Sequence, residues 1–362
     1  MKRHWGMSRG ESVASKCWLL LLIVFLAKTI FLPETSYAQV QVPSYELETI
    51  IKTGDRIDPI GNLVGTAMGT SINDEGKVTF TADVGGVNLR IIVKDRSTTD
   101  IIYPIAGELQ MGQYMQLNNT NKVVFNTRDR RDGDTTIVRL DYTDRDNPVI
   151  AHGSNFFQTP YSLVQPYMSM NNNGGVVFAG ELKVGGTALA FEDDNIRENG
   201  GMPDFQAVPI GGNPQFWPMI SDTNRIIVRG GAAANANMVL FIDETLDEAT
   251  AIPLATANEY RAIGLKPGIS DDGRVGVFAA DHLQEGKGIY GAAVNARNQA
   301  VLFRITGLSA GTDVNRRVAI NHSADAGPFD YTVVYMALND QGVLGIYTIG
   351  INVSNPIAGV LV

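Results

Sequence analysis

The stretch Met170-Asn-Asn-Asn-Gly-Gly-Val-Val-Phe178 decides the fold, because it specifies a tight turn followed directly by a β-strand. Asn171 can accept a hydrogen bond from a backbone N–H later in the turn, and Gly174 tolerates the left-handed backbone of a three-residue hairpin loop. Val176 and Phe178 are two residues apart, so they lie on one face of a strand. The stretch therefore predicts a β-hairpin with one face turned to a core.

The same pattern occurs six times along the chain. Each copy opens on Asn or Ser, has Gly or Asn three residues later, and has apolar residues five and seven positions after the opening residue. The opening residues are Asn73, Asn118, Asn171, Ser221, Ser270 and Asn339, at intervals of 45, 53, 50, 49 and 69. A fixed period of this size indicates a repeat architecture.

Further strands complete each repeat. We expect third strands at 87–94, 136–142, 188–192 and 238–243, and fourth strands at 101–106, 149–151, 207–210 and 252–255. Four strands in about 50 residues are typical of a propeller blade. We therefore predict an all-β fold, a β-propeller of about six four-stranded blades. The alternative is an open array or a pair of packed sheets.

The two ends of the repeat array are expected to meet. The last copy has hairpin strands at 333–338 and 343–351, a candidate third strand at 357–362, and no fourth strand. Residues 47–53 can supply that strand and remove the free sheet edge. The long last interval contains either an insertion at 306–331 or a degraded seventh blade.

The repeated phrase resembles the tandem N-x-x-G-x-V-x-F repeats of secreted bacterial proteins. It resembles more distantly the S-P-D-G-x-x-I-x-F blades of TolB-type propellers, to which Ser270-Asp-Asp-Gly-Arg-Val-Gly-Val277 is most similar, although the Pro is missing. The resemblance covers residues 45–362 and implies an architecture, since its residues form turns and core strands.

Residues 1–38 have the features of a secretory signal peptide. Basic residues precede the apolar run Trp18 to Ala27, and Ser36-Tyr37-Ala38 fits a cleavage site. A retained anchor is the alternative, although Lys28 ends the run too early for a membrane span. We expect a secreted, periplasmic or cell-surface protein with one repeat domain, 39–362.

The composition restricts the partners of that domain. Residues 39–362 contain 24 Lys and Arg (29 less 5) against 36 Asp and Glu (38 less 2), which disfavours nucleic acid. The one cysteine, Cys17, lies in the leader, so the domain has no disulfide. We expect a monomer without a membrane span after cleavage.

Two acidic loops are candidates for calcium, the only cofactor that the sequence suggests. They place several oxygen donors on short turns, as calcium requires, without matching the EF-hand spacing. The candidate ligands are Asp129, Asp132, Asp134, Asp141, Asp144 and Asp146. Arginines alternate with these carboxylates, so a solvated, self-neutralising rim is the alternative.

Other patterns carry weaker chemistry. Gly307-Leu-Ser-Ala-Gly311 matches the nucleophile elbow G-x-S-x-G but lacks the alternating strands and helices that an elbow needs. His152, His282 and His322 are too far apart in sequence for a zinc motif. We name no catalytic residue.

Aromatic residues between the repeats are candidates for a binding patch. Phe216, Trp217, Tyr161 and Tyr167 are expected to pack between blades, and a sugar-stacking platform is the alternative. The leading hypothesis is a non-catalytic propeller that binds a protein or a polysaccharide through its loops. The alternative is a secreted glycan- or lactone-cleaving enzyme with an axial carboxylate or metal site.

Overall fold

The computed structural model describes most of the repeat domain. It describes residues 51, 53–57, 61–66, 70–84, 88–95, 99–104, 109–129, 135–143, 149–153, 161–182, 187–192, 217–230, 237–246, 250–295, 297–322 and 329–353. These residues belong to the compact unit Ile50–Val362. The predicted leader falls in the other unit, Met1–Thr49, outside the described residues.

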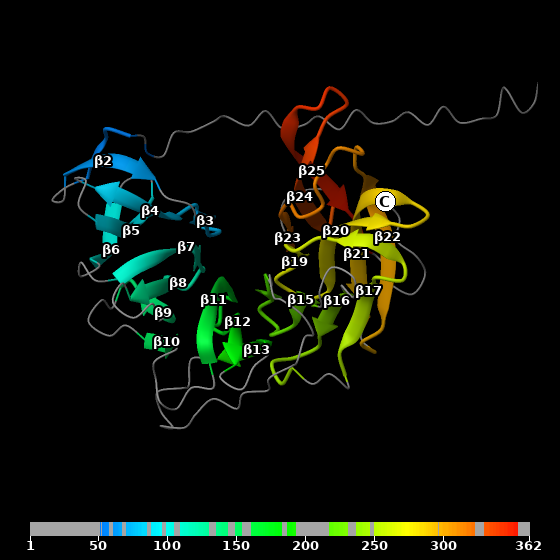
Figure 1. Cartoon of the computed structure of the whole chain (residues 1–362), viewed down its shortest axis with the longest axis horizontal. Helices are drawn as coiled ribbons and strands as arrows, with labels where there is room; N and C mark the ends of the chain where they lie inside the picture. Colours follow the sequence, from blue (N-terminus) through cyan, green and yellow to red (C-terminus); the bar gives the residue numbers. More distant parts are fainter. Residues whose placement is uncertain are drawn as a thin grey trace, which may run out of the picture. The chain divides into compact units, whose positions relative to one another are not determined.

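The described residues form six antiparallel sheets, which follow one another along the chain (Figure 1). The first sheet contains β1 (Arg56–Ile57), β2 (Gly61–Thr66), β3 (Ser71–Ile72), β4 (Val78–Val84), β5 (Asn88–Lys94) and β6 (Thr99–Pro104). The second contains β7 (Leu109–Leu117), β8 (Lys122–Asp129), β9 (Thr135–Asp141) and β10 (Val149–Gly153). The third contains β11 (Tyr161–Met170), β12 (Val176–Leu182) and β13 (Thr187–Glu192).

The remaining three sheets have the same antiparallel pairing. The fourth sheet contains β14 (Met219–Ile220), β15 (Ile226–Gly230), β16 (Asn237–Phe241) and β17 (Ile252–Thr256). The fifth contains β18 (Tyr260–Ile263), β19 (Gly268–Ile269), β20 (Val275–His282), β21 (Gly286–Val294) and β22 (Ala300–Gly307). The sixth contains β23 (Val318–His322), β24 (Tyr331–Leu338) and β25 (Leu344–Ile351). No described residue is helical, so the described part of the chain contains no helix that could span a membrane.

The expected third and fourth strands are confirmed wherever the structure describes them. The third strands are β5, β9, β13 and β16, and the fourth strands are β6, β10 and β17, with ends within two residues of the predicted ones. The strand expected at 207–210 and the third strand expected at 357–362 lie outside the described residues.

All six predicted turns are present. Their fourth residues have the positive φ that the sequence predicts: Gly76 (77°), Asn121 (64°), Gly174 (88°), Asn224 (60°), Gly273 (70°) and Gly342 (76°). In the third turn the Gly174 N–H donates to the Asn171 carbonyl at 3.1 Å, and the Gly175 N–H donates to Asn171 Oδ1 at 2.8 Å. The opening residue thus stabilises its own turn, as its side-chain chemistry predicts.

The opening side chains also join the turns to one another. Asn118 Nδ2 donates to the carbonyl oxygen of Asn171 at 3.0 Å, and Asn171 Nδ2 donates to that of Ser221 at 3.1 Å. Asn118, Asn171 and Ser221 are 4%, 3% and 1% exposed, so these bonds are shielded from water. Segments about 50 residues apart are therefore held in contact by one repeated side chain.

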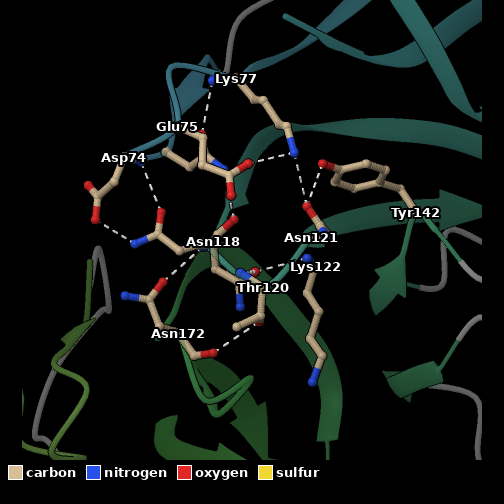
Figure 2. Close-up of polar contacts among 11 residues, drawn as sticks. Asp74, Glu75, Lys77, Asn118, Thr120, Asn121, Lys122, Tyr142 and Asn172 are labelled. Carbon is tan, nitrogen blue, oxygen red and sulfur yellow. Dashed lines mark hydrogen bonds and ion pairs between the residues drawn. The ribbon is translucent and has the colours of Figure 1, made fainter.

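The second residue of each of the first four turns adds a parallel set of bonds. The Asp74 N–H donates to Asn119 Oδ1 at 2.9 Å, the Asn119 N–H to Asn172 Oδ1 at 2.9 Å, and the Asn172 N–H to Asp222 Oδ1 at 2.8 Å. Figure 2 shows the contacts around the second turn, where residues of three successive turns lie together. The Asp222 N–H continues the series by donating to the Asp271 carbonyl at 2.9 Å.

The strands after the first five turns bury both faces, not one. Val123 and Phe125 of β8 pack with Ile91 of the first sheet, whereas Val124 packs with Phe178 of the third. The expectation of one buried face is wrong for this strand, because its sheet packs between two neighbouring sheets. Similar apolar clusters join the third sheet to the fourth, the fourth to the fifth, and the fifth to the sixth.

The sixth copy of the motif lies at a different hairpin from the others. In the second sheet, the turn of the motif comes directly after β7, and β7 is the strand that contacts β3 and β4 of the preceding sheet. In the sixth sheet β23 has that place: it packs against β19 and β20, and the Val318 N–H donates to the Lys266 carbonyl at 3.2 Å. The Asn339 turn joins the next pair of strands, β24 and β25. The long interval therefore contains an additional strand, β23, before the hairpin.

This shift exposes residues that the pattern predicts to be buried. Leu344 and Ile346 are 40% and 71% exposed, and Val334 beside them is 37% exposed. The opposite face of the same hairpin packs on the fifth sheet through Tyr331 and Val333. The prediction of a core-facing pair is thus wrong for the sixth copy, because its other face meets no sheet among the described residues.

Closure of the repeats into a ring stays a prediction. Residues 47–50 and Lys52 lie outside the described residues. Ile51 is described and packs against the cluster of Ile57, Leu63 and Phe80 in the first sheet. Within the described part of the chain, β25 pairs with β24 alone.

Candidate functional site

Two adjoining cavities lie where the segments that precede the turns come together. Their volumes are about 340 and about 500 Å³, and four residues line both: Tyr114, Trp217, Lys266 and Arg317. Cavities of this size fit small ligands or a few units of a polymer. We take these cavities as the candidate binding site.

The repeat register brings the main lining residues together. Tyr114, Tyr167, Trp217 and Lys266 each stand four residues before the opening residue of their turn. Since the turns bond to one another, residues at one repeat position also become neighbours. The strands add a second constraint, because neighbouring strand residues point to opposite faces. Met115 of β7 lies in the cluster shared with the first sheet, and Tyr114 packs on the other side, against the cluster that contains Met168.

The three aromatic residues form one group, which we call the aromatic cluster: Tyr114, Tyr167 and Trp217. The ring centroids of Tyr167 and Trp217 are 4.4 Å apart, and those of Tyr114 and Tyr167 are 5.3 Å apart. Tyr114 meets Trp217 edge to face at 4.8 Å. All three side chains are half-buried, so each keeps surface for a ligand. Burial raises the pKa of Tyr114, which stays neutral.

Positive charge lies against one end of the aromatic cluster. The Lys266 ammonium is 3.9 Å from the Trp217 ring centroid, within the range of a cation–π contact. Arg316 and Arg317 line the cavity beside it, and we call Lys266, Arg316 and Arg317 the basic cluster. Desolvation, followed by the charge of Arg317, lowers the pKa of Lys266.

One carboxylate faces this charge among the described lining residues. Asp313 lines the larger cavity, and its Oδ1 accepts the backbone N–H of Asn315 at 2.9 Å. The structure records no ion pair of Lys266, Arg316 or Arg317 with another described residue. The described lining therefore carries an excess of positive charge inside a chain that is acidic overall.

The structure brings two of the four aromatic candidates together. Tyr167 and Trp217 pack on each other, as expected for residues between repeats, and both line a cavity. A sugar-stacking role for them stays a prediction. Phe216 and the side chain of Tyr161 lie outside the described residues. Sequence reasoning missed Tyr114 and Lys266, although counting back four residues from each turn would have found them.

The calcium candidates are only partly described. Asp132, Asp134, Asp144 and Asp146 lie outside the described residues, as does the side chain of Asp129 in β8. Asp141 is described, and its Oδ1 accepts the Thr143 N–H at 2.9 Å, which is a local turn contact. The described residues contain no cluster of three metal-ligating side chains. The calcium site stays a prediction.

The other candidates take part in local contacts. Ser309 Oγ donates to the Leu338 carbonyl at 2.9 Å and lies in the loop after β22, with no helix behind it in the described chain. His282 Nδ1 accepts the backbone N–H of Glu285 at 3.1 Å. His152 and His322 lie in β10 and β23, and their side chains are outside the described residues.

Comparisons with known proteins give a fold and no family. No protein-family model matches the chain, and no curated protein sequence matches it. Its structure is similar to one from a structural and mechanistic analysis of two prolyl endopeptidases, with a TM-score of 0.50 and 10% identity over 80% of this chain. This chain spans 41% of that chain.

Two further solved structures are similar. The complex of KlAtg21 with the coiled-coil of AgAtg16 has a TM-score of 0.50 and 12% identity, over 81% of this chain and 83% of that chain. A putative TolB from Agrobacterium tumefaciens has a TM-score of 0.40 and 13% identity, over 70% of this chain and 85% of that chain. At these identities the similarity describes the fold alone. The chain is all-β in its described part, and the two structures with a TM-score of 0.50 have propeller-like folds.

Proposed function

We propose that this chain is an exported, non-catalytic propeller that binds a polysaccharide at the aromatic cluster. The observation that carries the proposal is the meeting of Tyr114, Tyr167 and Trp217 at two cavities, with ring centroids 4.4 to 5.3 Å apart. Aromatic rings offer flat apolar surface at little entropic cost, which suits the apolar face of a sugar ring.

The polar part of the lining favours the same class of ligand. Thr70, Ser71 and Gln116 border the smaller cavity, and Asn315 borders the larger one. Hydroxyl and amide groups can donate to and accept from sugar hydroxyls. Aromatic surface edged by such groups is the composition expected of a carbohydrate site.

A glycan array on the exported protein tests this proposal. We expect binding to one class of polysaccharide and its loss in Tyr167→Ala, which removes the middle ring of the aromatic cluster. Tyr347→Ala is the matched control, because Tyr347 stacks on Tyr335 in the sixth sheet and does not line the cavities. Binding that survives Tyr167→Ala, or an array without any bound glycan, would refute the proposal.

We also propose that the repeats close into a ring of about six blades, with residues 47–53 at the junction. The open apolar face around Val334, Leu344 and Ile346 supports closure, because a blade inside a ring buries both faces. Ile51 packs on the first sheet, so a strand that runs through it is well placed to join the first sheet to the last.

Export through the leader of residues 1–38 completes the proposal. Mass spectrometry of the protein recovered outside the cytoplasm tests it, with an N-terminus at Gln39 as the expected result. A protein that keeps its leader would contradict this part of the proposal.

A further inference from the structure

The cavities differ from an ordinary carbohydrate site in their charge. Lys266, Arg316 and Arg317 border the larger cavity, and one described carboxylate, that of Asp313, faces them. Asp313 already accepts the Asn315 N–H, so part of its hydrogen-bonding capacity is used within its own turn. Clustered cations without matching anions repel one another, and a bound anion would relieve that repulsion.

The positive charge is continuous with the aromatic surface. Lys266 lies over the ring of Trp217, and Trp217 contacts Tyr114 and Tyr167. A ligand that contacts both the rings and the cations needs a flat, partly apolar body. It also needs an anionic group attached to that same body. A uronic acid has this form, because its carboxylate is attached directly to the sugar ring.

We propose that the cavities select oligosaccharides of uronic acids, with Lys266 and Arg317 as the groups that bind the carboxylate. This inference rests on the proposed function and specifies its ligand. Arg317 presents a planar guanidinium that can pair with a carboxylate through two parallel bonds, and Lys266 supplies a second charge. Ser71 Oγ and Gln116 Oε1 already accept the backbone N–H groups of Leu117 and Met170. The Ser71 hydroxyl proton and the Gln116 amide N–H groups, together with Thr70 and Asn315, can bind the sugar hydroxyls.

The net negative charge of the protein would not lead one to expect an anionic ligand. An acidic chain repels polyanions at long range, and physiological salt screens that repulsion beyond about 8 Å. The basic cluster acts at contact distance from the cavity wall, where Lys266 and Arg316 are half-buried and Arg317 is exposed. We therefore expect slow association and an affinity that depends on contacts within the cavity.

Isothermal titration calorimetry tests the inference with two matched ligands. One is an oligomer of uronic acids and the other is its methyl ester, which has the same rings without the charge. We expect the acid to bind wild-type protein at least about tenfold more tightly than the ester, since charge-assisted hydrogen bonds are stronger than neutral ones.

Four variants locate the effect. We expect Lys266→Met and Arg317→Gln each to reduce the preference for the acid to about threefold or less. Arg297→Gln is the control and should leave the preference unchanged, because Arg297 is exposed and does not line the cavities. We expect Asp313→Asn to raise the affinity for the acid, since the amide oxygen still accepts the Asn315 N–H while the negative charge is lost.

Each other outcome overturns a defined part of the account. Equal affinity for acid and ester would overturn the inference and leave carbohydrate binding intact. Binding of neither ligand, together with an empty glycan array, would overturn both. Binding of poly-glutamate as tightly as the uronate oligomer would show that the cavities take acidic peptides instead. The comparison of acid with ester uses wild-type protein, so it stands even if a variant fails to fold.

Discussion

The ammonium of Lys266 lies 3.9 Å from the centroid of the Trp217 ring, although the two residues are 49 positions apart in the sequence. Each stands four residues before the opening residue of its turn, Ser270 and Ser221. The turns are joined by the bond from the Asp222 N–H to the Asp271 carbonyl. The contact at the candidate site is therefore a consequence of the register that the turns set.

The buried asparagine of the third turn should contribute strongly to stability. Asn171→Ala removes the acceptor for the Gly175 N–H and the donor to the Ser221 carbonyl, and leaves both groups buried without that partner. We expect the free energy of unfolding to fall by about 2–4 kcal/mol, measured by urea denaturation.

Asn339→Ala is the matched control for that variant. Asn339 makes the same local bond, to the Val343 N–H at 2.8 Å, but it is exposed, and the structure records no bond from it to a neighbouring turn. We expect a cost of about 1 kcal/mol or less. Equal costs at the two positions would show that the bonds between turns contribute nothing.

Two glycines with similar backbones should differ in their tolerance of alanine. Gly76 has φ of 77° and nothing near its missing Cβ, so Gly76→Ala should cost about 1–2 kcal/mol for the left-handed backbone alone. Gly273 has φ of 70°, and a Cβ there would meet the hydroxyls of Thr223 and Ser221 of the preceding turn. We expect Gly273→Ala to cost at least about 1 kcal/mol more in a thermal melt. Similar costs would contradict the close packing of the two turns.

Buried tyrosines should make the fold sensitive to alkali. Burial, with a smaller contribution from Tyr290, raises the pKa of Tyr260 to about 12, above the value of about 10 for an exposed tyrosine. The unfolded chain loses this proton first, so the stability is complete below pH about 10 and falls as the pH rises toward 12.

The urea midpoint between pH 8 and pH 12 measures this effect. Tyr260→Phe should flatten the decline, because phenylalanine keeps the packing against Phe278 and Tyr290 and has no proton to lose. A decline of equal slope in the variant would assign the alkaline sensitivity to other groups.

The open face of the sixth sheet provides a test of ring closure. Ile346 is 71% exposed among the described residues, so Ile346→Asp should be neutral in an open array. In the closed ring that we propose, the residue is covered, and the variant should lose about 2 kcal/mol or more in urea denaturation. Leu283→Asp is the control, because Leu283 is exposed at a hairpin end in either arrangement. Equal stability of the two variants would contradict closure.

The local features of the fold follow from the sequence. Asn or Ser at the opening position and Gly or Asn at the fourth predict the turns, and the structure has the positive φ at every one, including Asn121 and Asn224. The same chemistry also makes an unpredicted turn, where Asn295 Oδ1 accepts the Gln299 N–H between β21 and β22. Turn chemistry thus specifies that two strands form a hairpin, but not which two strands of a repeat they are. For this reason the sequence did not show that the sixth turn joins β24 to β25.

The bonds between repeats were not predicted, although the sequence contains their signal. The second turn residue is Asp or Asn in all six copies, and its use becomes visible only when Asn119 and Asn172 are found in adjacent turns. The basic cluster was missed for a related reason. Lys266 and Trp217 share a position in the repeat but no chemistry, so a search by residue type does not connect them.

The most direct test of the account uses the fluorescence of Trp217. The chain has three tryptophans, and Trp5 and Trp18 lie in the predicted leader. A protein cleaved after Ala38, as we propose, therefore has Trp217 as its single reporter, at the cavity wall. We predict that the uronate oligomer changes the emission of Trp217 saturably and that the methyl ester does so only at higher concentration. An emission spectrum that is unchanged by the bound oligomer would show that the ligand binds elsewhere and would contradict the account.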